Sequence, residues 1–392
     1  MKIALVHYWL INMRGGEYVL EQLCDLFPGA DIFTHVVDRS AISEKLLRHK
    51  IIETYIGRMP AAKKHYQKYL MLMPRALEEL DLRDYDLVIS SESGPAKGVL
   101  TRPGTPHICY VHSPMRYIWD LYPEYRDHLS FPTRQIFQAT AHRLRQWDFV
   151  SAQRIDHVIA NSSFVAKRIS KYWRREAEVL NPPVDLSRFT VSASPGEYYL
   201  YVSELVPYKR ADLALDAFRK LGKPLKIVGA GSELRRLKAN APTNVEFLGR
   251  VDNAELQSLY SGCKALIFPG EEDFGIVPLE AMASGRPVIA YGRGGVLDTV
   301  IPGHTGTFFN SQTVEALAEA IERFELEDQV RLHPAQIAAH AQSFSPERFR
   351  KRMMAIVKRT APELFEPDLE QRWSVPSSAD TAKIILNATP DV

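Results

Sequence analysis

The chain has 392 residues, 45% hydrophobic and 24% charged, which is the composition of a globular protein long enough for two domains. Its formal net charge of +2 excludes a general attraction to nucleic acid, so binding to an anionic surface would need a local patch. Three widely spaced cysteines, a short polar start unlike a signal sequence, and the lack of a bilayer-spanning apolar run predict a cytoplasmic protein with reduced thiols.

The first half of the chain alternates strand-like and helix-like stretches, which predicts a parallel α/β sheet. The pair Gly15-Gly16 separates the first strand, at 2–6, from a helix, and such a loop can face a phosphate or can simply be a tight turn. His112 follows a strand at 107–111, at the sheet edge where open α/β sheets bind ligands. Alone, each of these signals is weak.

The stretch 58–75 interleaves lysines with methionine, tyrosine and leucine. Its pattern favours a helix packed by its apolar face on the domain, and the alternative is a segment that lies on an anionic bilayer. Asp84-Tyr85-Asp86 has the spacing of a metal-binding D-x-D motif, but it runs directly into a strand. We interpret it as structural and predict no metal site.

The second half opens after the stiff segment 181–185. Lys209 and Arg210 precede a helix, where the helix dipole disfavours cations, so we expect them to bind an anion. The turn Gly229-Ala230-Gly231 resembles a dinucleotide fingerprint, but Leu234 occupies the third glycine position, which argues against a dehydrogenase.

Two carboxylates eight residues apart, Glu272 and Glu280, mark a strand, a glycine-bearing loop and a short helix. The unpaired N–H groups around 275–277 would point at a ligand on the helix axis, which suits a phosphate. Glu280 could accept hydrogen bonds from sugar hydroxyls, and Glu272 would reach the same ligand from its other side. We expect Lys209 and Glu280 to share one cavity.

This spacing, with the wider run from Phe268 to Gly295, resembles the retaining glycosyltransferases of family four, which have the GT-B fold of two facing Rossmann-like domains with parallel sheets. The sequence His112-Ser113-Pro114-Met115-Arg116-Tyr117 is similar to that of bacterial polysaccharide mannosyltransferases. The resemblance implies an acceptor-binding domain at 1–182, a nucleotide-sugar-binding domain at 183–345, a helix at 346–362 returning to the first domain, and a tail at 363–392.

The resemblance also implies the site residues. His112 would hold a sugar hydroxyl, Lys209 and Arg210 would neutralise the diphosphate, and Glu272 would fix the sugar. The chain departs from many relatives by carrying Glu204 in place of an arginine, which leaves the role of Arg210 open. The donor-binding residues implied are Gly15, Gly16, Lys209, Arg210, Arg250, Val251, Phe274, Gly275, Ile276, Val277 and Glu280, with Arg250 and Val251 beside the base.

The function implied is transfer of a hexose, preferably mannose from GDP-mannose, to a lipid-linked oligosaccharide in cell-surface polysaccharide assembly. No metal cofactor is implied, and the protein would work in the cytoplasm, with peripheral contact to the inner membrane through 58–75. Three alternatives stay open: a UDP-sugar donor, a sugar-nucleotide 2-epimerase of the same fold, and a nucleotide-sugar-binding scaffold without catalysis.

Overall fold

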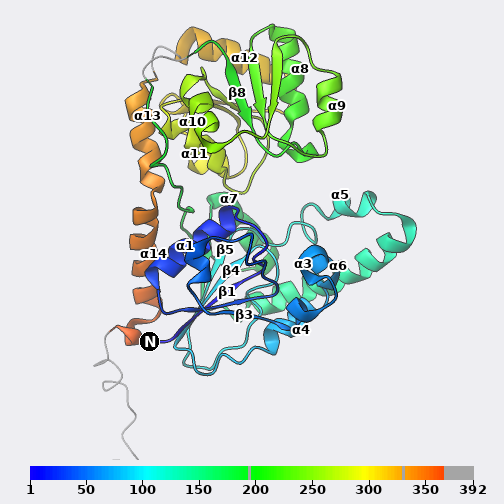
Figure 1. The fold of residues 1–392 in the computed structure, drawn as a ribbon, viewed down its shortest axis with the longest axis vertical. Helices are drawn as coiled ribbons and strands as arrows, with labels where there is room; N and C mark the ends of the chain where they lie inside the picture. Colours follow the sequence, from blue (N-terminus) through cyan, green and yellow to red (C-terminus); the bar gives the residue numbers. More distant parts are fainter. Residues whose placement is uncertain (193–195, 329–331, 366–392) are drawn as a thin grey trace, which may run out of the picture.

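Two α/β units, one above the other, make up the protein in the computed structural model (Figure 1). The structure describes residues 1–192, 196–328 and 332–365. From residue 366 on, the predicted tail at 363–392 lies outside the described residues. The connection between the two sheets runs from 180 to 198, and the proposed domain limit at 182 and 183 stays a prediction within it.

The first unit is built on a sheet of seven parallel strands in the order β3-β2-β1-β4-β5-β6-β7. The inner strands β1, β4 and β5 are buried along their whole length, and β1 and β5 are mostly apolar, whereas β4 ends with the buried polar residues Ser90, Ser91 and Glu92. The strands are β1 (Ile3–His7), β2 (Asp31–Thr34), β3 (Ile51–Glu53), β4 (Leu87–Glu92), β5 (His107–Val111), β6 (His157–Ala160) and β7 (Glu178–Val179).

The second unit has six parallel strands in the order β10-β9-β8-β11-β12-β13. The order reverses between the neighbours β8 and β11, and at such a switch point the loops after the two strands diverge and leave a crevice. The strands are β8 (Tyr199–Val202), β9 (Leu225–Val228), β10 (Val245–Gly249), β11 (Leu266–Phe268), β12 (Val288–Tyr291) and β13 (Gly306–Phe309).

Helices cover both sheets, and those expected after Gly15-Gly16, after Lys209-Arg210 and after the Glu272 loop are α1, α8 and α11. Ser162 caps α7, because its hydroxyl accepts the N–H of Val165 at 3.1 Å. The longer helices are α1 (Gly15–Leu26), α6 (Phe131–Ala152), α7 (Ser163–Trp173), α8 (Ala211–Leu221), α9 (Leu234–Ala239), α10 (Asn253–Gly262), α11 (Ile276–Ala283), α12 (Val314–Arg323), α13 (Pro334–Ala341) and α14 (Pro346–Thr360).

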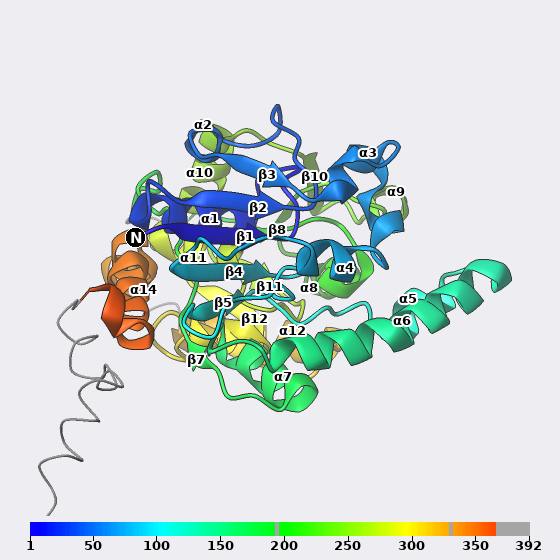
Figure 2. The ribbon, with the colours of Figure 1, turned by 90° about the horizontal axis from the view of Figure 1, so that it is seen from below.

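The stretch 58–75 is not one continuous helix. It contains α3 (Ala62–His65), η2 (Tyr66–Tyr69) and the start of α4 (Met73–Glu78). Its apolar residues, Met73 among them, pack mainly against Val36, Ile56 and Ala76 of the first unit, while its lysines are exposed. Beside it, α5 (Tyr122–Asp127) and α6 project from the unit as a helical arm (Figures 1 and 2).

The last helix returns to the first unit, as the sequence predicts. Along one side of the molecule, α13 and α14 run from the second unit down to α1 (Figure 1). Phe349, Met353 and Ile356 on α14 are buried in the core beneath the first sheet. Arg352 adds a hydrogen bond of 2.9 Å to the carbonyl of Val179. This helix therefore ties the two units together away from their facing edges.

All three cysteines are buried free thiols, as predicted. Within the described residues we find no helix with the length and apolar character needed to cross a bilayer.

Candidate functional site

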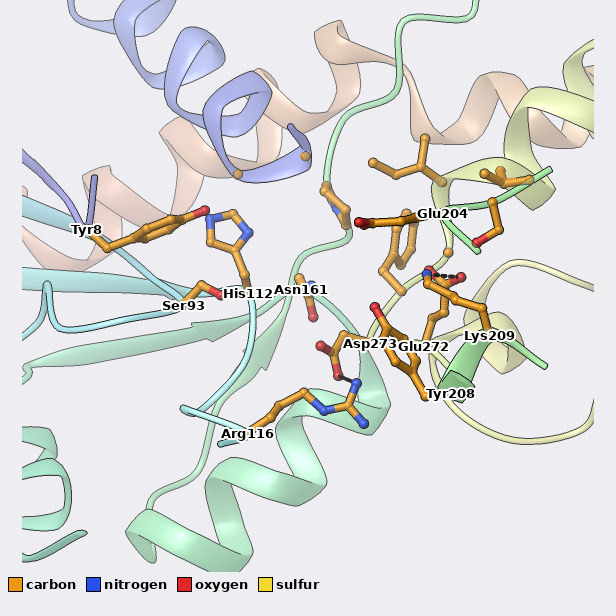
Figure 3. A pocket seen from close by; sticks show the side chains of 18 residues that line it. Tyr8, Ser93, His112, Arg116, Asn161, Glu204, Tyr208, Lys209, Glu272 and Asp273 are labelled. Carbon is orange, nitrogen blue, oxygen red and sulfur yellow. Dashed lines mark ion pairs between the residues drawn. The ribbon is translucent and has the colours of Figure 1, made fainter. Parts of the chain in front are cut away.

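A cavity of about 390 Å³ lies between the two units and is lined by residues from both. Nine of the predicted site residues line it: Gly15, Gly16, His112, Lys209, Glu272, Phe274, Gly275, Ile276 and Val277. In Figure 3 Tyr8, Ser93 and His112 form one wall, Tyr208, Lys209 and Glu272 the opposite wall, and Asn161 and Asp273 lie between them. These side chains follow the carboxyl ends of strands in both sheets, which is why distant parts of the chain meet here.

Lys209 and Glu272 form an ion pair on the second unit's wall. Their side chains are only 15% and 18% exposed. The loop carrying Glu272 is fixed from behind, because the Glu272 carbonyl accepts the N–H of Gly295 at 2.8 Å. The cavity thus presents a largely desolvated cation next to a carboxylate, and an anionic ligand at this wall would interact with the lysine through little intervening water.

The start of α11 supplies backbone donors to the same wall. Gly275 precedes the helix with φ of +91°, and a Cβ there would lie 3.2 Å from the Phe268 ring, so only glycine fits easily. No side chain caps this helix end. The first amides of a helix have no intrahelical acceptor, and together with the helix dipole they favour a negative charge. This end of the cavity is therefore suited to a phosphate.

His112 stands on the opposite wall, and it is held from behind. Its Nε2 lies 2.8 Å from the Ser91 hydroxyl. Burial, with a smaller contribution from the neighbouring His7, lowers the pKa of His112 to about 3, so the ring is neutral at physiological pH. Gly16 lies directly against this group, since a Cβ on it would sit 2.2 Å from the Tyr8 hydroxyl and 3.5 Å from His112 Nε2.

A clamp of charged residues joins the Glu272 loop to the first unit. Arg168 on α7 forms an ion pair with Asp273, and Arg116 adds a second at 3.7 Å (Figure 3). The Ser162 hydroxyl donates to the Asp273 carbonyl at 2.5 Å. Since Asp273 directly follows Glu272, these contacts set where Glu272 stands relative to the first unit.

Glu280 does not share the cavity of Lys209, which differs from the expectation of one shared cavity. It lines a neighbouring cavity of about 440 Å³, and the two cavities meet at Gly15 and Ile276. Its carboxylate accepts hydrogen bonds from Arg188 at 2.7 Å and Tyr260 at 2.8 Å. Burial raises its pKa, and these two hydrogen bonds act against that shift.

Arg250 and Val251 line a third cavity, of about 470 Å³, which adjoins the first at Ser203 and Glu204. Arg210 lines none of these three cavities. Its backbone is left-handed, with φ of +58°, and its guanidinium pairs with Asp212 at 3.2 Å. The structure therefore separates Arg210 from Lys209.

Sequence reasoning missed several lining residues, among them Tyr8, Ser93, Arg116 and Asp273. Tyr8 and Ser93 directly follow β1 and β4, so the strand-end rule that identified His112 would have found them. Within the described residues, no group of three or more histidine, cysteine, aspartate or glutamate side chains could hold a metal ion.

Two protein-family models match the chain, and between them they cover both units. Glycosyltransferase Family 4 matches residues 13–188, and Glycosyl transferases group 1 matches residues 186–341. The chain is a GT-B protein like the glycosyltransferases of family 4. This confirms the fold predicted from the motifs around Glu272 and His112.

Three curated relatives show the range of this similarity. The GDP-mannose-dependent monoacylated alpha-(1-6)-phosphatidylinositol monomannoside mannosyltransferase of Corynebacterium glutamicum is 35% identical over 33% of this chain and 38% of its own. Alpha-1,3/1,6-mannosyltransferase ALG2 of Dictyostelium discoideum is 29% identical over 43% and 52%. A glycogen synthase of Pseudomonas syringae pv. tomato is 27% identical over 49% and 39%. The chain spans about half or less of the length of these relatives.

A solved structure extends the fold match over nearly the whole chain. The Anabaena protein HepE, crystallised with UDP, aligns with a TM-score of 0.65, covering 92% of this GT-B chain and 100% of that one. The identity is 18%, so this likeness concerns the fold.

Proposed function

We propose that the chain transfers a hexose from a nucleoside diphosphate sugar to an acceptor hydroxyl, with GDP-mannose as the preferred donor. One observation carries the proposal: the start of α11, Lys209 and His112 converge on a single cavity between the two units. Such a cavity offers a site for a diphosphate on one wall and for a sugar hydroxyl on the other.

The donor would occupy the first cavity and reach into the two cavities that adjoin it. Its diphosphate lies at the α11 N-terminus, where Lys209 would exchange part of its pairing with Glu272 for phosphate oxygens. Its ribose meets Glu280, whose carboxylate has about four acceptor positions and keeps some free beyond Arg188 and Tyr260. Its base contacts Arg250 and Val251 in the third cavity.

In the reaction, the bond between the anomeric carbon and the diphosphate oxygen breaks while the acceptor oxygen bonds to that carbon on the same face. The departing phosphate oxygen takes the acceptor's proton, so the anomeric configuration is retained. Preorganised amides and Lys209 stabilise the charge on the leaving group. Glu272 and the amides near Phe274 and Gly275 hold the sugar. An NMR assignment of an inverted anomer in the product would refute retention.

The choice of mannose draws support from the names of two relatives, both mannosyltransferases. A UDP-sugar is the main alternative, because HepE was crystallised with UDP. Thermal-shift screening with GDP-mannose, UDP-glucose, UDP-GlcNAc and GDP-fucose separates them. At a concentration 100 times its dissociation constant, a donor stabilises the fold by about 2.7 kcal/mol. We expect the largest shift from GDP-mannose; a larger shift from a uridine sugar would reassign the donor, and no shift with any would overturn the proposal.

The acceptor we propose is a lipid-linked oligosaccharide, reached by peripheral contact with an anionic membrane on the cytoplasmic side. The stretch 58–75 offers exposed Lys63, Lys64 and Lys68 with Met71 and Leu72 partly exposed, although its other apolar residues pack on the first unit. Flotation with anionic vesicles tests this contact. Binding that is lost when the three lysines become glutamate supports it, and binding that is unchanged removes it.

A further inference from the structure

A line of buried polar side chains runs behind His112 and back to the loop that carries Gly15 and Gly16, here called the glycine loop. Ser91 Oγ lies 2.8 Å from His112 Nε2 and 3.0 Å from His7 Nδ1. His7 Nε2 in turn lies 3.8 Å from the Glu17 carboxylate. This distance is too long for a hydrogen bond, but it is short enough for a strong electrostatic interaction with the carboxylate charge. Glu17, His7 and Ser91 are each at most 1% exposed, so water does not compete for these contacts.

Glu17 is ionised and also holds the glycine loop. Its carboxylate accepts the N–H of Arg14, the residue before Gly15, at 2.9 Å. Burial raises the pKa of Glu17, but the adjacent His7 ring and the backbone N–H groups outweigh burial, so its pKa lies below the ordinary value. The same carboxylate therefore fixes the start of α1 and faces the far end of the histidine line.

For a His7 ring that carries a single proton, the Glu17 charge sets the direction of every hydrogen in the line. A His7 ring with one proton carries it on Nε2, because a bare nitrogen lone pair facing a buried carboxylate is unfavourable. His7 Nδ1 then only accepts, so the Ser91 hydroxyl donates to it. The Ser91 oxygen in turn accepts from His112, whose proton must be on Nε2.

His112 Nδ1 is left as the unprotonated nitrogen. Across the described residues it has no hydrogen-bond partner, and His112 lines the cavity. We propose that Glu17, His7 and Ser91 are positioning residues that fix the Nε2–H tautomer of His112, so that Nδ1 accepts a hydrogen bond from a hydroxyl of the donor sugar. The sugar contact rests on the proposed function, whereas the tautomer belongs to the protein alone.

The chain contains a matched control on the same strand. Ser90 Oγ lies 2.8 Å from His107 Nε2, and both residues are as buried as Ser91. Ser90 and Ser91 are neighbours on β4, so their side chains leave opposite faces of the sheet. Ser90→Ala removes one serine–histidine hydrogen bond, and Ser91→Ala removes two, those to His7 and His112. Both variants empty the same kind of buried position on the same strand, but only Ser91→Ala touches His112.

The tautomer is measured first, by NMR of the full chain labelled with ¹⁵N histidine at pH 8 without ligand. His112 signals are identified by their loss in His112→Gln. We expect a single Nε2–H tautomer in the wild type and in Ser90→Ala, and a mixture in Ser91→Ala. A wild-type His112 protonated on Nδ1, or a Ser91→Ala spectrum like that of Ser90→Ala, overturns the inference. The tautomer found in the wild type tests the inference by itself, even if Ser91→Ala does not fold.

Calorimetric titration with GDP-mannose and with GDP then tests the sugar contact. Only rings in the other tautomer lose the sugar contact, so the loss follows the tautomer ratio that the NMR measures. Relative to Ser90→Ala, Ser91→Ala should weaken GDP-mannose binding about twofold for an equal mixture and about tenfold if one ring in ten keeps Nε2–H, and should leave GDP binding unchanged. Equal loss for both ligands contradicts a sugar-specific role. Failure of the wild type to bind either ligand would count against the proposed function, while the tautomer result would still stand.

Discussion

Lys209 and Arg210 are neighbours in the chain, yet they face different surroundings. Lys209 lines the central cavity, whereas Arg210, in a left-handed backbone conformation, pairs with Asp212. The Arg210 side chain is 30% exposed, so its ion pair with Asp212 is a surface pair that contributes little to stability. The two cations therefore should not contribute equally to catalysis.

Replacing Lys209 by alanine should lower kcat by about 10²- to 10³-fold, because the proposed mechanism loses a preorganised group that stabilises the leaving diphosphate. Arg210→Ala is the control, and its kcat should stay within about threefold of the wild type. Steady-state kinetics with saturating donor measures both. Equal losses in the two variants would show that both cations act on the diphosphate.

The space for a side chain at Gly16 is limited mainly by one neighbouring atom, the Tyr8 hydroxyl oxygen. Gly16→Ala should raise the KM for the donor more than tenfold, because the loop must shift away from His112 to relieve a 2.2 Å contact. Adding Tyr8→Phe removes that hydroxyl and leaves the nearest ring carbon at 3.3 Å, so the double variant should recover most of the loss. Gly29→Ala, with open space around it, serves as the neutral control.

At the scale of elements, the sequence predicts most strands and helices correctly because their signals are local. The buried strands β1 and β5 are mostly apolar, β4 begins with the apolar run Leu87–Ile89, and α7 begins at a serine that caps it. The stretch 58–75 breaks into short helices whose apolar side packs on the first unit, and only the fold decides which side that is. Contacts such as that between Arg116 and Asp273 join residues more than a hundred positions apart, so spacing within a motif cannot reveal them.

The clamp between α7 and the Glu272 loop makes its own prediction. Arg168 is buried and holds Asp273, Asp120 and Ser113 together, so Arg168→Ala leaves two carboxylates without their main partner. Breaking a buried pair in this way costs about 3–5 kcal/mol, and partial exposure of both aspartates lowers that figure. Urea unfolding should show a clear loss of unfolding free energy for Arg168→Ala. The control Arg75→Ala breaks a surface pair with Glu79, and its loss should be less than about 1 kcal/mol. Similar losses would argue against the clamp.

At the scale of the whole molecule, buried histidines link stability to pH. Burial lowers the pKa of His35 to about 4 and that of His107 to about 3, below the ordinary value of 6.5. The unfolded state therefore binds more protons below pH 6.5, and stability is lost as the pH falls from there towards 4.

Because the unfolded state takes up a proton that the folded state does not, each of these histidines should lower the free energy of unfolding by about 2 kcal/mol between pH 6.5 and pH 5. Urea unfolding of the wild type and of His107→Gln at pH 7 and pH 5 measures this effect. Between pH 7 and pH 5, the free energy of unfolding of the variant should fall by about 2 kcal/mol less than that of the wild type. Identical losses would mean that His107 titrates normally in the folded protein.

The two units also explain why the expected single cavity is divided. Gly15 of the first unit meets Ile276 of the second, and this contact separates the cavity of Lys209 from that of Glu280. Sequence motifs place both residues on the second unit, but the wall between them depends on how the first unit faces it. A donor that reaches from Lys209 to Glu280 has to pass this contact.

The central claim is that Lys209 and the start of α11 hold the diphosphate of a nucleotide sugar between the two units. A crystal structure of the protein soaked with GDP-mannose tests it most directly. We predict phosphate oxygens at roughly 3 Å from Lys209 Nζ and from the backbone N–H of Ile276 or Val277. A diphosphate bound elsewhere, with Lys209 still paired to Glu272 alone, would contradict the account.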